Sequence, residues 1–263
     1  MNCKNIGIYG KITLFYLKYI GKLMASREIY YKERRFTISY DIINPSKQEV
    51  IVILHGWGSN KEIMKQAFKN TLGEYKHIYI DMAGFGKSSI EMALKTTDYA
   101  LIMKEFLNLL DVKYNTIMGH SFGGKVATLM SSKNLVLLSS SGILVPKPFG
   151  VKLKIFSTKI LKSLGLGAIS NVFKSKDVDG MSQNMYETFK NVVNEEFEHN
   201  FSNSKSRALL FWGEEDTATP LWTAKKIDTL LQKSTLYPLK GDHFFFLKHS
   251  EFISQTITKE FKK

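Results

Sequence analysis

The sequence predicts an α/β protein whose core is a mostly parallel, doubly wound sheet with helices on both faces. Three observations lead to this fold class. Short, fully apolar runs recur along the chain, as strands buried on both faces require. Segments with the periodicity of amphipathic helices separate these runs. The 263 residues are enough for one large α/β domain with an insertion.

Composition narrows the function classes. The single cysteine, Cys3, excludes a disulfide framework, and the six histidines lack the spacing of metal ligands, so we expect neither a metal nor another cofactor. The net charge of +13 raises the question of a nucleic-acid partner. Arginine usually leads in binding phosphates and bases, and here the few arginines do not cluster. We therefore expect no nucleic-acid partner, but a lysine-rich surface on a cytoplasmic enzyme.

Residues 1–25 are expected to lie outside the core as an N-terminal extension. Their first 23 residues contain four lysines and no acidic residue. The apolar run Ile12 to Leu17 is too short to span a membrane and poorly resembles a signal peptide. A basic amphipathic segment of this kind could contact a membrane surface. Alternatively, the protein could start at Met24, which is followed by Ala-Ser, and the preceding residues would then be an upstream extension.

The first half of the core begins with alternating polar and apolar residues at Glu28–Tyr31 and Arg35–Ile43. This alternation predicts an antiparallel hairpin. Val50–Leu54 is fully apolar and predicts a central strand. A helix at Lys61–Leu72 and a strand at His77–Ile80 follow.

The strand–helix alternation continues through the middle of the chain. Thr97–Leu110 has helical periodicity and Thr116–Met118 predicts a buried strand. The next pair is a helix at Lys125–Ser131 and a strand at Leu135–Leu138, the sixth of the sheet. This order is typical of a parallel sheet.

Residues 143–205 interrupt the pattern, because they contain no run that predicts a buried strand. Helical patterns occur at 151–164 and 184–199, with proline and glycine between them. We interpret the segment as a helical lid inserted after the sixth strand. The core would then consist of residues 26–142 and 206–263.

The sheet resumes at Ala208–Trp212. A helix at Pro220–Leu231 follows, with proline suited to a first turn. Ser234–Tyr237 predicts the last strand, and a terminal helix is expected from about Phe246.

The strand at Thr116–Met118 runs into Gly119–Gly123, a Gly-x-Ser-x-Gly motif, and then into a helix. Such a sharp strand-to-helix turn leaves its serine, Ser121, exposed on a strained backbone. The two glycines give the turn room to close. The amide of Phe122 would open the helix with its N–H free to bind an anion. The motif thus predicts a nucleophilic serine.

Two other strand ends present Asp216 and His243. A serine hydroxyl needs a base to take its proton, and histidine suits that task near neutral pH. A carboxylate is then needed to hold the imidazole in the right tautomer. Ser121, His243 and Asp216 are therefore our candidate catalytic residues.

Other carboxylates compete for the role of the acid. Asp242 directly precedes the histidine, from where it would reach Nδ1 with difficulty, and Glu214 and Glu215 adjoin Asp216. The end of the preceding strand, Ser139–Ser141, offers no carboxylate.

Together these motifs resemble the α/β-hydrolase superfamily, from about Glu28 to the C-terminus, and in particular its small lid-bearing esterases and carbon–carbon bond hydrolases. The order Ser, Asp, His is the one expected on that fold. One departure is Ala83, where the family often has proline. The motifs that carry the resemblance are His55–Gly58 (His-Gly-Trp-Gly), Asp81–Ser88, the turn at Ser121, Gly213–Asp216 and Gly241–His243.

The resemblance also implies an oxyanion hole made by the backbone N–H groups of Trp57 and Phe122. Further residues near the substrate pocket are expected at His55, Gly56, His120 and Phe244.

The function expected is hydrolysis of a small ester through an acyl-enzyme. An alternative is meta-cleavage-type hydrolysis of a carbon–carbon bond in 2-hydroxy-6-oxodienoates, where the family commonly has an arginine in the lid. Residues 143–205 contain no arginine. A non-catalytic binding protein on the same scaffold is a further alternative.

The partner expected is a small ester or acyl substrate. Ile143 to Lys176 contains seven lysines and no acidic residue, so it could attract an anionic or carrier-bound substrate or an anionic membrane surface. Esterases that release acids from carrier proteins have a similar His-Gly-Trp-Gly loop. The alternative is a lid helix whose lysines simply face solvent.

Overall fold

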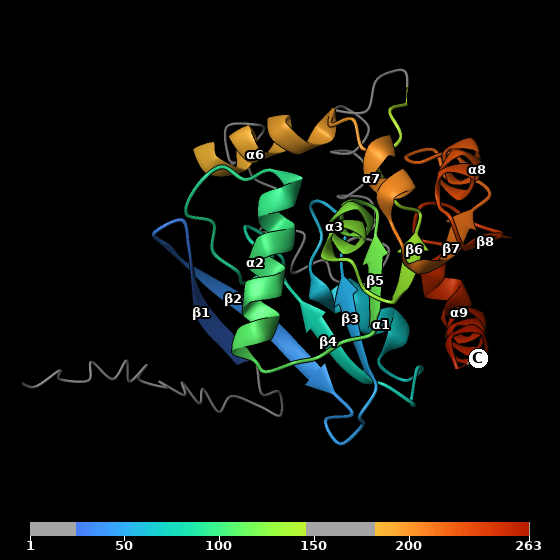
Figure 1. Cartoon of the computed structure of the whole chain (residues 1–263), viewed down its shortest axis with the longest axis horizontal. Helices are drawn as coiled ribbons and strands as arrows, with labels where there is room; N and C mark the ends of the chain where they lie inside the picture. Colours follow the sequence, from blue (N-terminus) through green and yellow to red (C-terminus); the bar gives the residue numbers. More distant parts are fainter. Residues whose placement is uncertain (1–24, 146–181, 263) are drawn as a thin grey trace, which may run out of the picture.

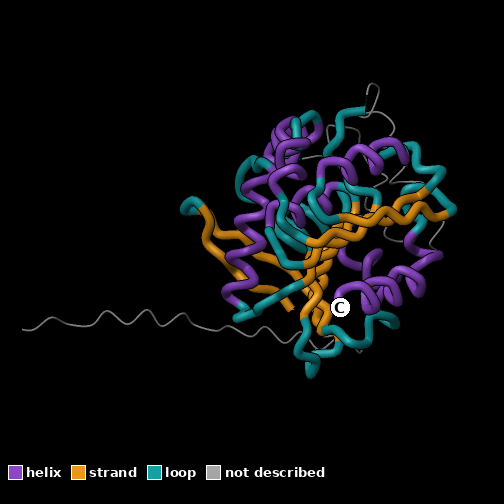
Figure 2. The backbone as a smooth tube through the Cα atoms, turned by 45° about the vertical axis from the view of Figure 1, so that its right-hand side comes forward, coloured by secondary structure: helices purple, strands orange, loops and turns teal. Residues whose placement is uncertain are grey.

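The computed structural model describes residues 25–145 and 182–262, in which one eight-stranded sheet has helices on both sides (Figures 1 and 2). The predicted α/β fold class is confirmed. The strands are β1 (Ala25–Tyr31), β2 (Arg34–Ile43), β3 (Val50–Leu54), β4 (Lys76–Ile80), β5 (Thr116–His120), β6 (Asn134–Leu138), β7 (Arg207–Gly213) and β8 (Ser234–Leu239). The helices are α1 (Lys61–Phe68), α2 (Thr96–Leu109), α3 (Phe122–Met130), α6 (Gln183–Val193), α7 (Glu198–Asn203), α8 (Leu221–Leu230) and α9 (Phe246–Phe261).

The strands lie in the order β1-β2-β4-β3-β5-β6-β7-β8. The pairs β1–β2 and β2–β4 are antiparallel, and all the others are parallel. The central strand β3 sets Val52 opposite Ile78 of β4 and Ile117 of β5. Because β3 to β8 run in one direction, the segments that follow them meet at one edge of the sheet.

Successive side chains along a strand pack into two hydrophobic cores, one on each face of the sheet. In β3, Val50, Val52 and Leu54 pack into the core shared with α2, α3 and α8. Ile51 and Ile53 face the opposite core, which α1 and α9 cover. All five are buried, which explains why the run is apolar throughout rather than alternating. Each such side chain contributes about 1.5–3 kcal/mol by leaving water.

Helix α1 ends at Phe68, four residues before the predicted end at Leu72. The carbonyl of Phe68 accepts hydrogen bonds from both the backbone N–H and the hydroxyl of Thr71. Leu72 then takes a left-handed φ of 54° while its side chain stays buried. Leu72, the apolar residue at the end of the predicted helix, is therefore buried as part of a turn and not of the helix.

The single helix predicted at 184–199 is wrong, because the structure has two helices, α6 and α7, with a break between them. In the break, Glu195 pairs with Lys125 of α3, and Phe197 is buried in the core. Residues two apart on one helix point in nearly opposite directions. A continuous helix would not serve both contacts.

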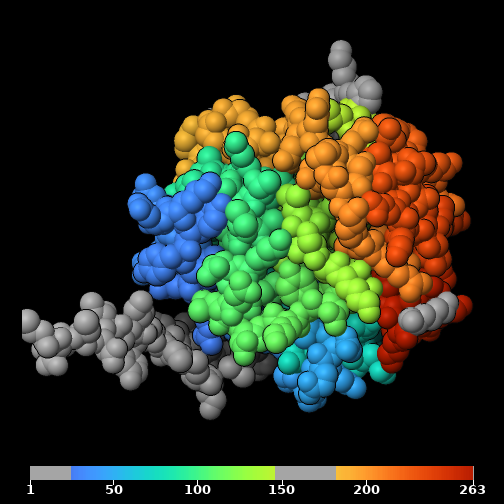
Figure 3. All heavy atoms as spheres, in the orientation of Figure 1, coloured from blue at the N-terminus to red at the C-terminus, as the bar shows by residue number. Residues whose placement is uncertain are grey.

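Helices α6 and α7 lie beyond the edge of the sheet at which the parallel strands end, with α6 above α2 and α7 beside α8 (Figures 1 and 3). They are the described helices of the predicted lid, 143–205. Residues 143–145 of that segment and the residues around the two helices are also described. Residues 146–181, including the predicted helix at 151–164 and most of the segment's lysines, fall outside the described residues, as do residues 1–24. Among the helices that the structure describes, none is both long and apolar enough to cross a membrane.

Candidate active site

Ser121 forms the whole turn between β5 and α3, with φ 52° and ψ −115°. This conformation is unfavourable for a residue with a Cβ, so the surrounding structure must enforce it. Helix α3 begins at the next residue, Phe122, three residues earlier than predicted. The backbone N–H of Ser121 donates to the carbonyl of Leu138, which fixes the turn on β6.

The glycines on either side make this turn possible. A Cβ at Gly119 would lie 2.2 Å from the carbonyl oxygen of Gly123, and one at Gly123 would lie 2.4 Å from the carbonyl oxygen of His55. Both contacts are with backbone, which cannot move aside. The two glycines of the motif therefore serve close packing between strand, helix and loop.

Replacing Gly119 with alanine should destabilise the fold by about 3 kcal/mol or more, because a methyl group would overlap the first turn of α3. Urea denaturation would measure the change in the free energy of unfolding. Gly73→Ala is the matched control, since a Cβ there meets nothing within 4 Å. Equal stability of the two variants would contradict the close packing.

Asp216 and His243 meet at the same edge of the sheet, after β7 and β8. The Nδ1 atom of His243 donates to Oδ2 of Asp216 at 2.7 Å, and both side chains are buried. This bond fixes the tautomer and leaves Nε2 as the basic nitrogen. Asp242, the rival acid, is exposed and accepts the backbone N–H of Phe244. Glu214 and Glu215 are exposed.

Asp216 is held by more groups than the sequence analysis foresaw. Its Oδ1 accepts the backbone N–H groups of Ala218 and Thr219, and Oδ2 accepts the Thr219 hydroxyl at 2.8 Å. Burial alone would raise the pKa of Asp216, but His243, Thr219 and Ser139 lower it to about 2. The sequence Asp-x-x-Thr could have indicated the role of Thr219, because an aspartate side chain often accepts the backbone amides two and three residues after it. Nothing in the sequence pattern singled out Ser139.

The loop that begins at His55 passes directly over Ser121. A Cβ at Gly56 would lie 3.1 Å from Cβ of Ser121 and 3.0 Å from Nδ1 of His120. His55 is buried, donates from Nδ1 to the carbonyl of Gly56, and accepts the backbone N–H of Met82. Burial lowers its pKa. His55 thus fastens the loop and offers no base.

His120 packs against His243 with ring centroids 4.6 Å apart. Its Nε2 donates to the carbonyl of His243 at 3.0 Å, and among the described residues its buried Nδ1 has no hydrogen-bond partner. Burial and the neighbouring His243 push the pKa of His120 well below its usual value. Phe244 lies against both rings, at 5.0 Å and 5.4 Å. His120 is therefore a neutral support for His243.

The two residues whose backbone amides are expected to form the oxyanion hole, Trp57 and Phe122, both line the pocket with Ser121. Phe122 is the first residue of α3, so its N–H has no acceptor within the helix, and the positive end of the helix dipole lies there. Trp57 belongs to the loop over Ser121, and its ring packs on that of Phe122 with centroids 5.5 Å apart.

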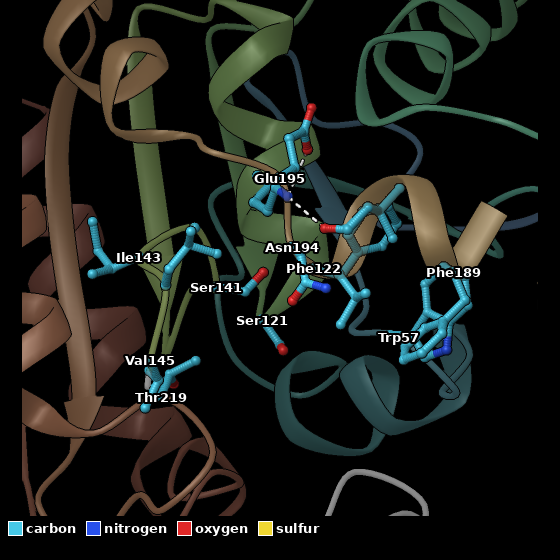
Figure 4. A pocket seen from close by; sticks show the side chains of 15 residues that line it. Trp57, Ser121, Phe122, Ser141, Ile143, Val145, Phe189, Asn194, Glu195 and Thr219 are labelled. Atoms are coloured by element: carbon cyan, nitrogen blue, oxygen red, sulfur yellow. Dashed lines mark hydrogen bonds and ion pairs between the residues drawn. The ribbon is translucent and has the colours of Figure 1, made fainter. Parts of the chain in front are cut away.

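A pocket opens at Ser121 (Figure 4). Of the expected residues, it includes Ser121, Trp57 and Phe122. The expected pocket residues His55, Gly56, His120 and Phe244 are absent from the lining that the described residues form, as are Asp216 and His243. The remaining lining residues are Lys125, Ser141, Gly142, Ile143, Leu144, Val145, Phe189, Val192, Val193, Asn194, Glu195 and Thr219.

The lining is mostly apolar, with one ion pair. Trp57 and Phe189 lie on one side of Ser121, and Ile143 and Val145 on the other (Figure 4). Lys125 and Glu195 form the pair, at 2.6 Å. Burial lowers the pKa of Lys125, an effect that Glu195 opposes. Neither residue was predicted from the sequence. Within the described ranges, no group of three or more metal-ligating side chains comes together.

Comparisons with known proteins agree with this architecture. Residues 49–162 match a family model described as alpha/beta hydrolase fold. The chain is 25% identical to an uncharacterized hydrolase, YugF, of Bacillus subtilis, over 85% of this chain and 96% of that protein. The structure superposes on a putative lipase from Acinetobacter baumannii with a TM-score of 0.74, 16% identity and 91% coverage of each chain. A meta-cleavage product hydrolase from Pseudomonas fluorescens gives a TM-score of 0.69 and 15% identity, covering 90% of this chain and 97% of that one.

Proposed function

This chain belongs to the α/β-hydrolase superfamily, and on that premise we propose that it is a serine hydrolase that cleaves a small carboxylic ester. The observation that supports this most strongly is the buried hydrogen bond between Asp216 and His243 at the sheet edge where the turn holds Ser121. A nucleophile, a base and an orienting acid are together sufficient for acyl transfer.

In the proposed reaction, Ser121 Oγ attacks the ester carbonyl carbon while His243 Nε2 takes the hydroxyl proton. Asp216 stabilises the imidazolium that forms. The amides of Trp57 and Phe122 donate to the negatively charged carbonyl oxygen. His243 then gives the proton to the departing alcohol, and a water molecule, activated by the same histidine, releases the acid from Ser121. No cofactor is needed for these steps.

The carbon–carbon bond hydrolase is the alternative proposal, and the pocket favours it less. Its substrate has an acidic end, which would need a free cation. Among the described lining residues the only cation is Lys125, which is already paired with Glu195. An ester without a carboxylate makes no such demand.

The experiment that tests the proposal compares p-nitrophenyl butyrate with a 2-hydroxy-6-oxodienoate on the purified chain. We expect hydrolysis of the ester and none of the dienoate. A fluorophosphonate should label Ser121, identified by mass spectrometry of the peptide. Hydrolysis of the dienoate alone would favour the alternative, and a chain that neither turns over nor takes the label would be a binding protein.

The pH dependence should show one ionisation. We expect kcat/KM for p-nitrophenyl butyrate to rise with pH and level off, because His243 must be unprotonated to act as base. Below the plateau the slope of log kcat/KM should not exceed one, because a single proton must be lost. Although His120 lies against His243, its lowered pKa keeps it neutral in that range, and Asp216 titrates near 2.

A slope of two would show that His120 titrates together with His243, and a flat profile would argue against a histidine base. His199→Gln is the control, because His199 is exposed on α7 and should leave the profile unchanged.

A carrier-bound or anionic substrate, or a membrane surface, remains a proposal for the basic segments. These lie in residues 1–24 and 146–181, outside the described part of the chain. Attraction by exposed lysines is screened over about 8 Å at physiological ionic strength, so added salt should lower kcat/KM for an anionic ester and not for a neutral one. Location in the cytoplasm is likewise proposed on the composition alone.

A further inference from the structure

The wall of the pocket formed by the break between α6 and α7 is polar. Asn194 ends α6, and Glu195 follows it directly. Both line the pocket that contains Ser121, and in the view of Figure 4 the amide group of Asn194 lies between the Ser121 hydroxyl and Glu195. The other walls, made by Trp57 and Ile143 with their neighbours, are largely apolar.

The charge of Lys125 is paired within the protein. Its Nζ donates to the carbonyl of Val192 at 2.9 Å and to Oε2 of Glu195 at 2.6 Å, and it lies 5.0 Å from the ring centroid of Phe197. A lysine has three N–H groups. Two of these are used by Val192 and Glu195, the side chain is buried, and its charge is already paired, so Lys125 is poorly placed to hold a substrate carboxylate.

Glu195 and Asn194, by contrast, have hydrogen-bonding capacity to spare. One carboxylate oxygen, Oε2, takes the bonds from Lys125 and from the Thr96 hydroxyl. The side chain of Glu195 is 24% exposed, and among the described residues nothing bonds Oε1. The Asn194 side chain is exposed and likewise has no hydrogen-bond partner in the described ranges.

From this wall we infer that the pocket selects esters bearing a hydroxyl group, bound through Asn194 and Glu195. The inference rests on the proposed ester hydrolysis. An alkyl chain seated there would bury polar groups without partners, which costs affinity. A carboxylate would face Glu195, and an ammonium would approach Lys125. A hydroxyl donates to the carboxylate and exchanges hydrogen bonds with the amide while leaving the ion pair balanced.

The test uses two pairs of esters that differ by a hydroxyl in place of a methyl group. For the acyl side the pair is p-nitrophenyl 3-hydroxybutyrate and p-nitrophenyl 3-methylbutyrate. For the alcohol side it is 2-hydroxyethyl butyrate and propyl butyrate. A single good hydrogen bond should favour the hydroxylated member of one pair by about tenfold in kcat/KM.

Three variants identify the residues responsible. Asn194→Ala should bring that ratio to within about threefold of one, because it removes one of the two hydrogen-bonding partners. Glu195→Gln should lower the ratio, because the amide NH2 that replaces the free carboxylate oxygen can no longer accept the proton of the substrate hydroxyl. Glu195→Gln can still accept from Lys125 and Thr96, so the wall should keep its shape. Glu196→Gln is the matched control on the next, exposed residue and should keep the ratio. A ratio measured on one enzyme is unaffected by the fraction that is active.

A ratio near one in both pairs, or one that neither Asn194→Ala nor Glu195→Gln changes, would overturn the inference. Measurements of substrate binding distinguish failure of this inference from failure of the proposed ester hydrolysis. Methyl 3-hydroxybutyrate should bind the Ser121→Ala variant with lower Kd than methyl 3-methylbutyrate, and Asn194→Ala should remove the difference. The same comparison is made for the alcohol side with 2-hydroxyethyl butyrate and propyl butyrate. A lower Kd for the hydroxylated member of either pair would support the inference even if no ester were hydrolysed, and equal Kd values in both pairs would refute it even in an active esterase.

Discussion

The Ser121→Ala variant is expected to hydrolyse p-nitrophenyl butyrate more slowly than the unaltered chain by a factor on the order of 10³ or more. The hydroxyl is the proposed nucleophile, and its loss removes little packing, so the fold should persist. Steady-state kinetics would measure the loss, and thermal unfolding would confirm that the variant is folded.

A second serine in the pocket provides the control. Ser141 lines the same cavity, yet its N–H donates to the carbonyl of Ser121 and its position offers no strained turn. The Ser141→Ala variant should still react with a fluorophosphonate, whereas Ser121→Ala should not. Activity of Ser121→Ala within tenfold of the unaltered chain would sink the assignment of the nucleophile.

The Asp216→Asn variant should lose activity by about 10³- to 10⁴-fold, because the amide would favour the wrong tautomer of His243. The pKa of Asp216 is about 2, lower than its usual value, so its charge stabilises the fold above about pH 4. That stabilisation disappears only as pH falls through 2. The loss of kcat/KM is therefore best compared on the high-pH plateau, where Asp216 is charged in the unaltered chain and His243 is unprotonated in both enzymes.

Asp242→Asn is the matched control, since Asp242 directly precedes the histidine but its carboxylate accepts the backbone N–H of Phe244. We expect that change to cost far less than Asp216→Asn. A larger loss in Asp242→Asn would mean that the acid has been misassigned.

The fold could be predicted because its signals are local. A fully apolar run such as Val50–Leu54 has few alternatives to a buried strand, and its ends mark where loops meet at one edge of the sheet. The turn at Ser121 could also be predicted from the sequence, because only glycine fits at positions 119 and 123. A Cβ added at either position would come within 3 Å of the backbone of another segment.

The parts that could not be predicted depend on contacts between distant segments. Residues 184–199 have the periodicity of one helix, and what breaks that helix is the pairing of Glu195 with Lys125, seventy positions earlier. The support of Asp216 by Ser139 depends on the neighbouring strand β6. No local pattern encodes either contact, so the polar wall of the pocket becomes visible only in three dimensions.

The pairing of β6 with β7 has an evolutionary consequence. The chain leaves the sheet after β6 and returns at β7, its immediate neighbour, and both points are fastened to the core. Ser139 N–H donates to the carbonyl of Phe211 at the exit, and Arg207 N–H donates to the carbonyl of Lys133 at the return. The intervening segment can therefore vary in length and sequence without disturbing the register of the sheet. Ser121, Asp216 and His243 all lie outside that segment, so substrate preference can diversify there by exchange of a single module.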